Sequence, residues 1–421
     1  MNTSNTSAPN PSAPSTAASP APAPSVSTGT APLYWMALGT FAIGTEGFMI
    51  AGMLPTVAHD LHVSPAIAGQ LVVAFTAAYA ISSPILTALT GALNRRLLLI
   101  ATMALFALAN LLAWKAPGYE ALLFARIVLA MAAGLYVPNA MALAGALVAP
   151  DKRGGALAIV SGGLTVAVAL GAPLGVLIAD RLDWRMTFAG VAVLSALAML
   201  GLMRGLPRGI GDHLPVASLR ERISAARNGR VLHGLLTTLL WATGAYTMYT
   251  YFAIYLNEVA DVHGAHVGYG LLLWGVSAAV GVMAGGKLSD RLGFARVSAP
   301  ALSFMMASFL ALAAIAYTLA PAHALLPIYL AMIVWGVSAW AFHPAQQARL
   351  MNIAGVKLAS IVLSLNASFM YLGFSLGAAM GALTVATGSV REVGLVAAAF
   401  VAGSLLLLRG ALRREAAPAV A

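Results

Sequence analysis

The stretch GLPRGIGDHLPVASLRERISAARNGR (205–230) is the longest polar interruption in an otherwise apolar chain. A helix that crosses a membrane needs about 20 mostly apolar residues. Twelve stretches of suitable length and composition flank this interruption, six on each side. They are residues 33–54, 66–89, 97–114, 119–147, 156–178 and 187–204, then 231–255, 267–288, 297–319, 325–347, 358–385 and 393–409. The pattern predicts an all-α membrane protein with twelve transmembrane helices in two pseudo-symmetric six-helix bundles.

The overall composition supports a lipid environment. Of the 421 residues, 60% are hydrophobic and only 9% are charged, whereas a soluble domain carries about 25% charged residues. The chain has no cysteine, which excludes disulfides and thiolate chemistry. The net charge of +10 comes from basic residues between the apolar stretches, so it indicates membrane topology and not a nucleic-acid partner.

We divide the chain accordingly into five parts. Residues 1–32 are rich in Ser, Ala, Pro and Thr and are expected to be a disordered tail. Residues 33–204 form the first bundle and 231–409 the second, with 205–230 as a cytoplasmic linker that contains a short amphipathic helix around 219–226. Residues 410–421 are expected to be a cytoplasmic tail.

The distribution of basic residues predicts the orientation. Most of the 23 Lys and Arg residues fall in one set of loops and in the linker. The opposite set holds only four, which are Lys115, Arg181, Arg185 and Arg391. Because cytoplasmic loops carry the excess of Lys and Arg, we expect both termini in the cytoplasm of a bacterium, and the chain in its inner membrane.

The two halves also look like a repeat. LTALTGALNRR (86–96) follows the second apolar stretch, and GGKLSDRLGFAR (285–296) follows the eighth. Both are helix ends rich in small residues that lead into a short basic loop. Two six-helix halves with a binding site between them are a recurrent plan of secondary transporters.

At these residues the sequence resembles the major facilitator superfamily, and more narrowly its twelve-span drug:proton antiporter branch. The second-half loop matches the G-x-L-x-D-R-x-G signature through Gly286, Asp290, Arg291 and Gly293, with Leu288 between them. The resemblance implies that this loop gates the cytoplasmic side. In the first-half copy, Gly91 and Ala92 replace the Asp and Arg, and only Arg95 and Arg96 remain to contribute.

Further motifs extend the resemblance over residues 33–409. Arg126 matches the arginine of the fourth-span signature, and Gly171, Pro173 and Gly175 match the core of the fifth-span antiporter motif. GTEGFMIAGMLP (44–55) is similar to the first-span pattern, and Asp183-Trp184-Arg185 with Phe188 fits the entry to the sixth span. The fifth-span motif implies a hinge or seal, although proline and small residues also serve ordinary close packing.

Glu46 is the one acidic residue that we place deep inside a predicted span. At 1.5 Å rise per residue, Glu46 and Arg126 lie at a similar depth, roughly 10–12 Å below the outer boundary. Ionisable groups within the membrane usually face a cavity or a partner. We hypothesise that Glu46 carries the proton and that Arg126 is its charge partner or a partner for substrate. A purely structural ion pair is the alternative.

A polar and aromatic set is predicted to line a central cavity, since pockets combine apolar walls with a few placed polar groups. Tyr251 and Tyr255 are instead assigned to the aromatic belt near the headgroups, which is the commoner use of Tyr and Trp. The cavity set is Gln70, Tyr79, Tyr136, Asn139, Trp241, Tyr246, Tyr249, Trp335, Asn366 and Tyr371.

The remaining motifs limit the energy source. No histidine pair has metal-ligand spacing, so we expect no metal site. No G-x-x-x-x-G-K-[ST] loop is present, so we expect no ATP hydrolysis and no cofactor. The energy source is then an ion gradient or the gradient of the substrate itself, and we expect a proton gradient.

The sequence therefore predicts a proton-coupled exporter of small amphipathic or drug-like molecules that works by alternating access. The alternative is an exporter or facilitator of sugars, purines or nucleosides, with Glu46 structural. A membrane enzyme is disfavoured, because one buried carboxylate makes no acid–base or metal cluster. The small-molecule substrate and the oligomeric state are left open.

Overall fold

A computed structural model describes residues 30–149, 152–207 and 217–416, and within these ranges the regular structure is entirely helical. The helices that precede the linker are α1 (Ala31–Gly52), α2 (Leu54–Asp60), α3 (Pro65–Leu89), α4 (Arg95–Trp114), α5 (Tyr119–Ala146), α6 (Arg153–Arg181) and α7 (Arg185–Gly205). Those that follow are α8 (Leu219–Arg227), α9 (Gly229–Ala260), α10 (Ala265–Leu292), α11 (Phe294–Thr318), α12 (Pro321–Thr387), the short 3₁₀ helix η2 (Val390–Glu392) and α13 (Val393–Ala416).

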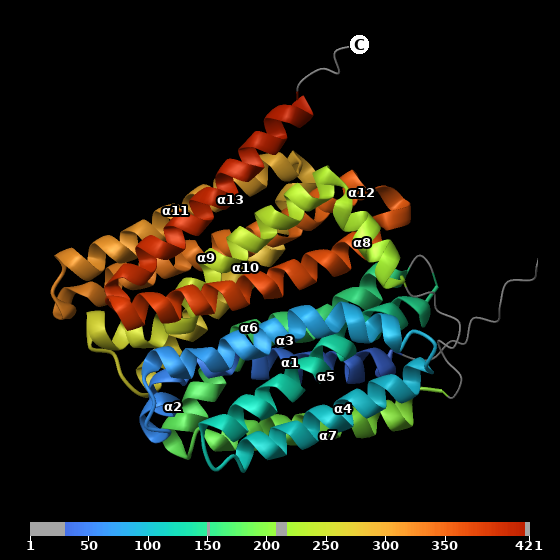
Figure 1. Ribbon diagram of the computed structural model, residues 1–421, viewed down its shortest axis with the longest axis horizontal. Helices are drawn as coiled ribbons and strands as arrows, with labels where there is room; N and C mark the ends of the chain where they lie inside the picture. The colour runs from blue at the N-terminus through green and yellow to red at the C-terminus, as the bar shows by residue number, and fades with distance from the viewer. Residues whose placement is uncertain (1–29, 150–151, 208–216, 417–421) are drawn as a thin grey trace, which may run out of the picture.

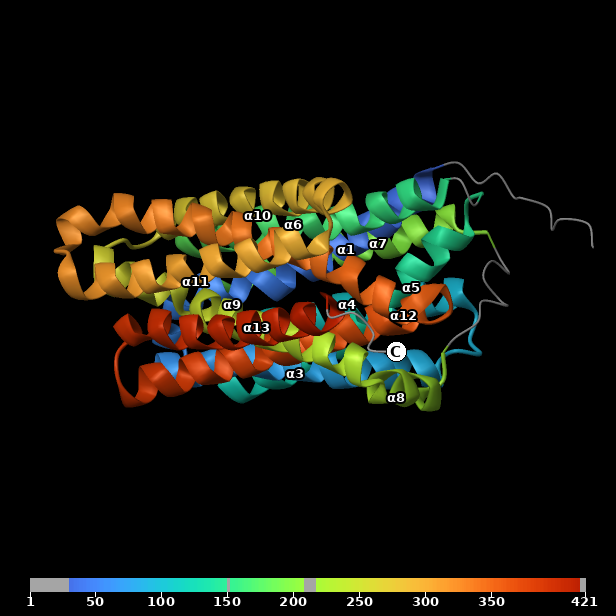
Figure 2. The ribbon, with the colours of Figure 1, turned by 90° about the horizontal axis from the view of Figure 1, so that it is seen from above.

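The helices form two bundles that lie side by side (Figure 1). Helices α1–α7 make up one bundle, and α9–α13 make up the other. The view from above shows the same long helices running in a common direction (Figure 2). Helix α2 lies at one end of the molecule and α8 at the opposite end, so we call these the α2 end and the α8 end. Across the two bundles, α3 packs against α12 and α6 packs against α10.

The predicted spans all correspond to helical segments. Ten helical segments of the described chain are long and apolar enough to cross a membrane, and the bent pair α1–α2, with an angle of 69°, makes an eleventh. Helix α9, the seventh predicted span, is long enough at 32 residues but is rich in Thr and Tyr. Helix α12 contains two spans that break at Gly355, where φ is 69°. The all-α membrane fold is therefore confirmed.

The parts outside the bundles differ from expectation at their edges. The short linker helix is present as α8, and Ser218 and Glu221 form a capping box at its start. Helix α13 continues to Ala416, past the expected end at 409. Most of the expected N-terminal tail (1–29), the middle of the linker (208–216) and the last residues (417–421) lie outside the described residues.

The two halves repeat a hydrogen bond at corresponding places. In the first half, the hydroxyl of Tyr136 on α5 donates to the backbone oxygen of Met36 on α1, at 3.3 Å. In the second half, the amide of Gln346 on α12 donates to the backbone oxygen of Gly234 on α9, at 2.7 Å. In each half the fourth span therefore ties its side chain to the first, as expected for a repeated unit.

Candidate transport site

Glu46 and Arg126 form a salt bridge in the interior of the first bundle. Glu46 lies on α1 and Arg126 on α5, and both side chains are fully buried. Nη1 of Arg126 donates to the Glu46 carboxylate and also, at 3.3 Å, to the Glu46 backbone oxygen. The similar depth estimated from the sequence agrees with this contact.

Helix α3 holds the arginine from the other side. Nε of Arg126 donates to the backbone oxygen of Leu71 at 3.2 Å, and the guanidinium lies 4.3 Å from the centre of the Phe75 ring. Among the described residues, Oε2 of Glu46 and Nη2 of Arg126 have no hydrogen-bond partner. Helix α3 thus holds the pair in place, while Oε2 of Glu46 can still accept a hydrogen bond and Nη2 of Arg126 can still donate one to another group.

The ion pair lies close to the second bundle. Phe48, two residues after Glu46, accepts a hydrogen bond through its backbone oxygen from the Tyr249 hydroxyl of α9, at 3.3 Å. The Phe48 ring also lies 6.4 Å from the Tyr246 ring. A change in the charge of Glu46 therefore occurs about half a helical turn from the contact between the halves.

The predicted fifth-span motif packs α6 against α1 beside this pair. A Cβ atom on Gly171 would lie 2.9 Å from Cα of Thr45, and one on Gly175 would lie 2.7 Å from Cβ of Met49. Pro173 presents its backbone oxygen toward Gly268 of α10. Helix α6 runs without interruption through the motif, and its two glycines let it pack closely against α1 within the first bundle.

Tight contacts join the two halves near the α2 end. A Cβ atom on Gly52 would lie 2.8 Å from Leu271, and one on Gly69 would overlap the Tyr251 hydroxyl. Tyr251 and Tyr255 are both fully buried, and Tyr255 donates to the Leu312 backbone oxygen at 2.7 Å. The assignment of these two tyrosines to a headgroup belt is therefore wrong, because each ring packs inside the protein.

Several predicted cavity residues gather where the halves meet. Tyr79 of α3 and Tyr371 of α12 stack with ring centres 3.7 Å apart. On the second-half side, Tyr249 packs on Trp335, with ring centres 6.5 Å apart. Trp241 and Tyr246 border the same small void as Trp335.

Other predicted cavity residues have different surroundings. Gln70 is exposed and lines a shallow groove between α3 and α12 instead of a central cavity. Tyr136 makes the α5–α1 bond described above, and Asn139 accepts a hydrogen bond from Arg95 at 2.6 Å. Asn366 accepts one from Thr238 at 2.7 Å. Tyr136 and Asn139 thereby connect helices of the first half, and Asn366 connects helices of the second. Each has a partner, as buried polar groups require.

The predicted gate residues of the two halves have different surroundings. Asp290 and Arg291 are exposed in the last turn of α10. The loop expected after them is very short, because Gly293 (φ 81°) alone separates α10 from α11. Gly286, one turn earlier, has open space around its Cα. In the first half, Arg95 is buried against Asn139, and the two bonds of Arg96 go to backbone oxygens at the end of α7. Both arginines therefore contact their own bundle.

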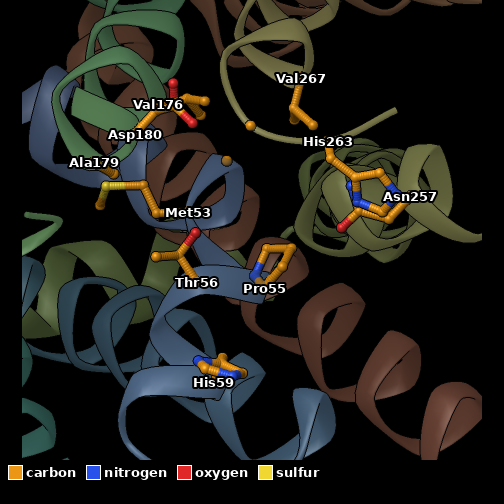
Figure 3. A pocket seen from close by; sticks show the side chains of 12 residues that line it. Met53, Pro55, Thr56, His59, Val176, Ala179, Asp180, Asn257, His263 and Val267 are labelled. Carbon is orange, nitrogen blue, oxygen red and sulfur yellow. The ribbon is translucent and has the colours of Figure 1, made fainter. Parts of the chain in front are cut away.

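A pocket of about 330 Å³ lies between the halves at the α2 end (Figure 3). His59 and Asp180 come from the first bundle, and Asn257 and His263 from the second. Gly264, with φ 56°, brings its backbone close to the Asp180 carboxylate. Within the described ranges, no group of three or more His, Cys, Asp or Glu residues is arranged to hold a metal.

Sequence reasoning missed four aromatic residues that border these groups. Phe75 underlies the arginine, while Trp274, Trp340 and Phe374 border the void on the second-half side. All four lie in spans whose largely apolar sequence does not identify the inward direction.

Comparison with known proteins is consistent with this architecture. The Major Facilitator Superfamily model matches residues 36–378. The inner membrane transport protein YdhP of Escherichia coli (strain K12) is 32% identical over 377 residues, which cover 90% of this chain and 94% of YdhP. A chloramphenicol resistance protein of Streptomyces lividans is 33% identical over 262 residues, which cover 62% of this chain and 67% of that protein.

A solved structure has the same fold. A bacterial homologue of the human lysosomal transporter Spinster, in an inward-facing and occupied conformation, aligns with a TM-score of 0.74 at 17% identity. The alignment covers 90% of this chain and 96% of that one. The chain belongs to the major facilitator superfamily and is a multi-pass integral membrane transporter.

Proposed function

We propose that the protein exports small amphipathic or drug-like molecules in exchange for protons by alternating access. The observation that carries this proposal is the fully buried Glu46–Arg126 ion pair beside the contact between the halves. A buried ionisable pair is costly in a membrane and is retained for transport in many proteins. The relative named for chloramphenicol resistance supports a drug-like substrate.

Coupling would follow from the charge of the pair. A proton that binds Oε2 of Glu46 neutralises the carboxylate and weakens its attraction for Arg126. The guanidinium then becomes available to another acceptor. Because Phe48 of the same helix accepts from Tyr249 across the boundary, a small movement of α1 would alter the contact between the halves. Proton binding and the rocking of the halves would thereby be linked.

The remaining motif residues would serve the conformational change. The glycines of α6 let α1 and α6 move as one packed unit at the boundary. Asp290 and Arg291, exposed at the α8 end, are free to contact the first bundle when that end closes. We place the α8 end in the cytoplasm of a bacterium, with the chain in the inner membrane, because the basic residues concentrate there.

Transport into proteoliposomes under an imposed pH gradient tests the proposal. The panel contains chloramphenicol, other lipophilic drugs, pentoses and nucleosides. We expect accumulation of one or more drugs only when the gradient is present and its loss when a protonophore collapses the gradient. Movement of pentoses or nucleosides that does not depend on the gradient would overturn the proposal.

A further inference from the structure

The inner face of the second bundle contains an aromatic cluster around a small void. The void has a volume of about 10 Å³, close to the smallest that can hold one water molecule. Seven aromatic residues of α9, α10 and α12 provide most of its wall; they are Trp241, Tyr246, Tyr249, Trp274, Trp335, Trp340 and Phe374. None of the residues that line the void carries a full charge. The surroundings therefore favour an uncharged occupant.

Three of these residues have buried donors without acceptors. The indole N–H groups of Trp241, Trp274 and Trp335 find no hydrogen-bond acceptor among the described residues, and each side chain is at most 4% exposed. Indole nitrogen is a donor only. An unsatisfied buried donor is costly, and such groups in a native structure call for an explanation.

A chain of stacked rings connects the cluster to the boundary of the halves. Tyr246 stacks on Phe374, with ring centres 3.7 Å apart, and Phe374 lies 5.4 Å from Tyr371. Tyr371 in turn stacks on Tyr79 of the first bundle. A planar ring could replace one of these stacked contacts with little loss of packing, since offset and edge-to-face aromatic pairs have similar energies.

We propose that this cluster binds a planar, uncharged aromatic compound that is rich in hydrogen-bond acceptors, and that the three indole N–H groups donate to it. The ring of the ligand separates Tyr246 from Phe374 and enlarges the void. This assignment rests on the proposed transport function and specifies its substrate class. A sugar fits poorly, because its hydroxyl groups bring many donors to a wall that offers few acceptors.

Calorimetric binding to the purified full-length protein in detergent tests the assignment without any gradient. The matched probes are para-nitroanisole, which has acceptor oxygens and no donor, and para-ethyltoluene, which has neither. We expect Trp335→Phe, which keeps an aromatic ring but removes the N–H, to weaken para-nitroanisole binding about three- to tenfold. The same variant should leave para-ethyltoluene binding unchanged.

Trp114→Phe is the matched control, because Trp114 lies at the end of α4, far along the chain from the cluster, and contacts Lys115. Equal weakening of both probes by Trp335→Phe, or no weakening of either, would overturn the assignment. Trp274→Phe provides an independent second test. If both indole variants behave as expected but the wild type shows no proton-coupled transport, the binding site stands and the proposed function fails.

Discussion

Arg126 of α5 donates to the carboxylate of Glu46 on α1, and neither side chain reaches the surface of the protein. The arginine is fixed further by a backbone oxygen of α3 and by the Phe75 ring. Three helices of the first bundle therefore converge on one ion pair. The corresponding region of the second bundle holds an aromatic cluster instead, so the two halves differ in chemistry while they share a fold.

Removal of the arginine charge should destabilise the protein by leaving the carboxylate buried without a cation. We expect Arg126→Gln to cost about 3–5 kcal/mol, measured as a lower thermal midpoint in detergent. The double variant Glu46→Gln/Arg126→Gln should recover most of this loss, because two neutral amides can hydrogen-bond to each other. A double variant no more stable than the single one would contradict the ion-pair interpretation.

A methyl group at Gly171 should disturb the contact between α6 and α1. The added Cβ would lie 2.9 Å from Cα of Thr45, so one helix must shift. We expect Gly171→Ala to cost about 1–3 kcal/mol and to slow transport. Gly162→Ala on the same helix is the matched control, because a Cβ there meets nothing within 4 Å. The close-packing role fails if the two variants have equal thermal midpoints and transport rates.

The linker helix α8 should lose protection as the pH falls. Hydrogen bonds from the backbone N–H and the hydroxyl of Ser218 hold the pKa of the Glu221 carboxyl below its ordinary value. Because the pKa is lowered on folding, the carboxylate stabilises α8 above the unfolded pKa and loses this effect as pH falls through the folded pKa.

Hydrogen exchange of α8 amides, corrected for intrinsic rates, measures this effect. Protection should fall at acidic pH in the wild type, and in Glu221→Gln, which has no titratable carboxyl, it should not change with pH. The start of α4 is the internal control, because the neutral amide of Asn94 caps it. Parallel pH profiles for α8 and α4 would show that the Glu221 carboxylate has no such role.

The sequence predicted the helices well because apolar length and polar breaks determine them directly. The break at 205–230 lies between the two bundles, α1–α7 and α9–α13. The one span with a low apolar content, α9, is rich in Thr and Tyr that the bundle buries. Hydropathy alone undervalues such a helix, since its polar groups find partners inside the protein.

The site was predictable only where charge made a position exceptional. Glu46 and Arg126 stood out because buried charges need partners. Gln70 was misplaced because the largely apolar sequence of its span does not identify the inward face. Tyr251 was misplaced because its position near the end of the seventh predicted span suggested the headgroup region. The largely apolar sequence of its span likewise hid Trp274. Depth along a helix follows from residue counting, but the direction of a side chain depends on packing with distant helices.

The decisive measurement is substrate-driven proton movement in proteoliposomes that contain a pH-sensitive dye. With an imposed chloramphenicol gradient, the wild type and the exposed-carboxylate control Glu258→Gln should move protons in the opposite direction to the drug. Glu46→Gln keeps the shape of the side chain but cannot carry a proton, so it should exchange drug without moving protons. Proton movement in Glu46→Gln at the wild-type rate would contradict the assignment of Glu46 as the proton carrier.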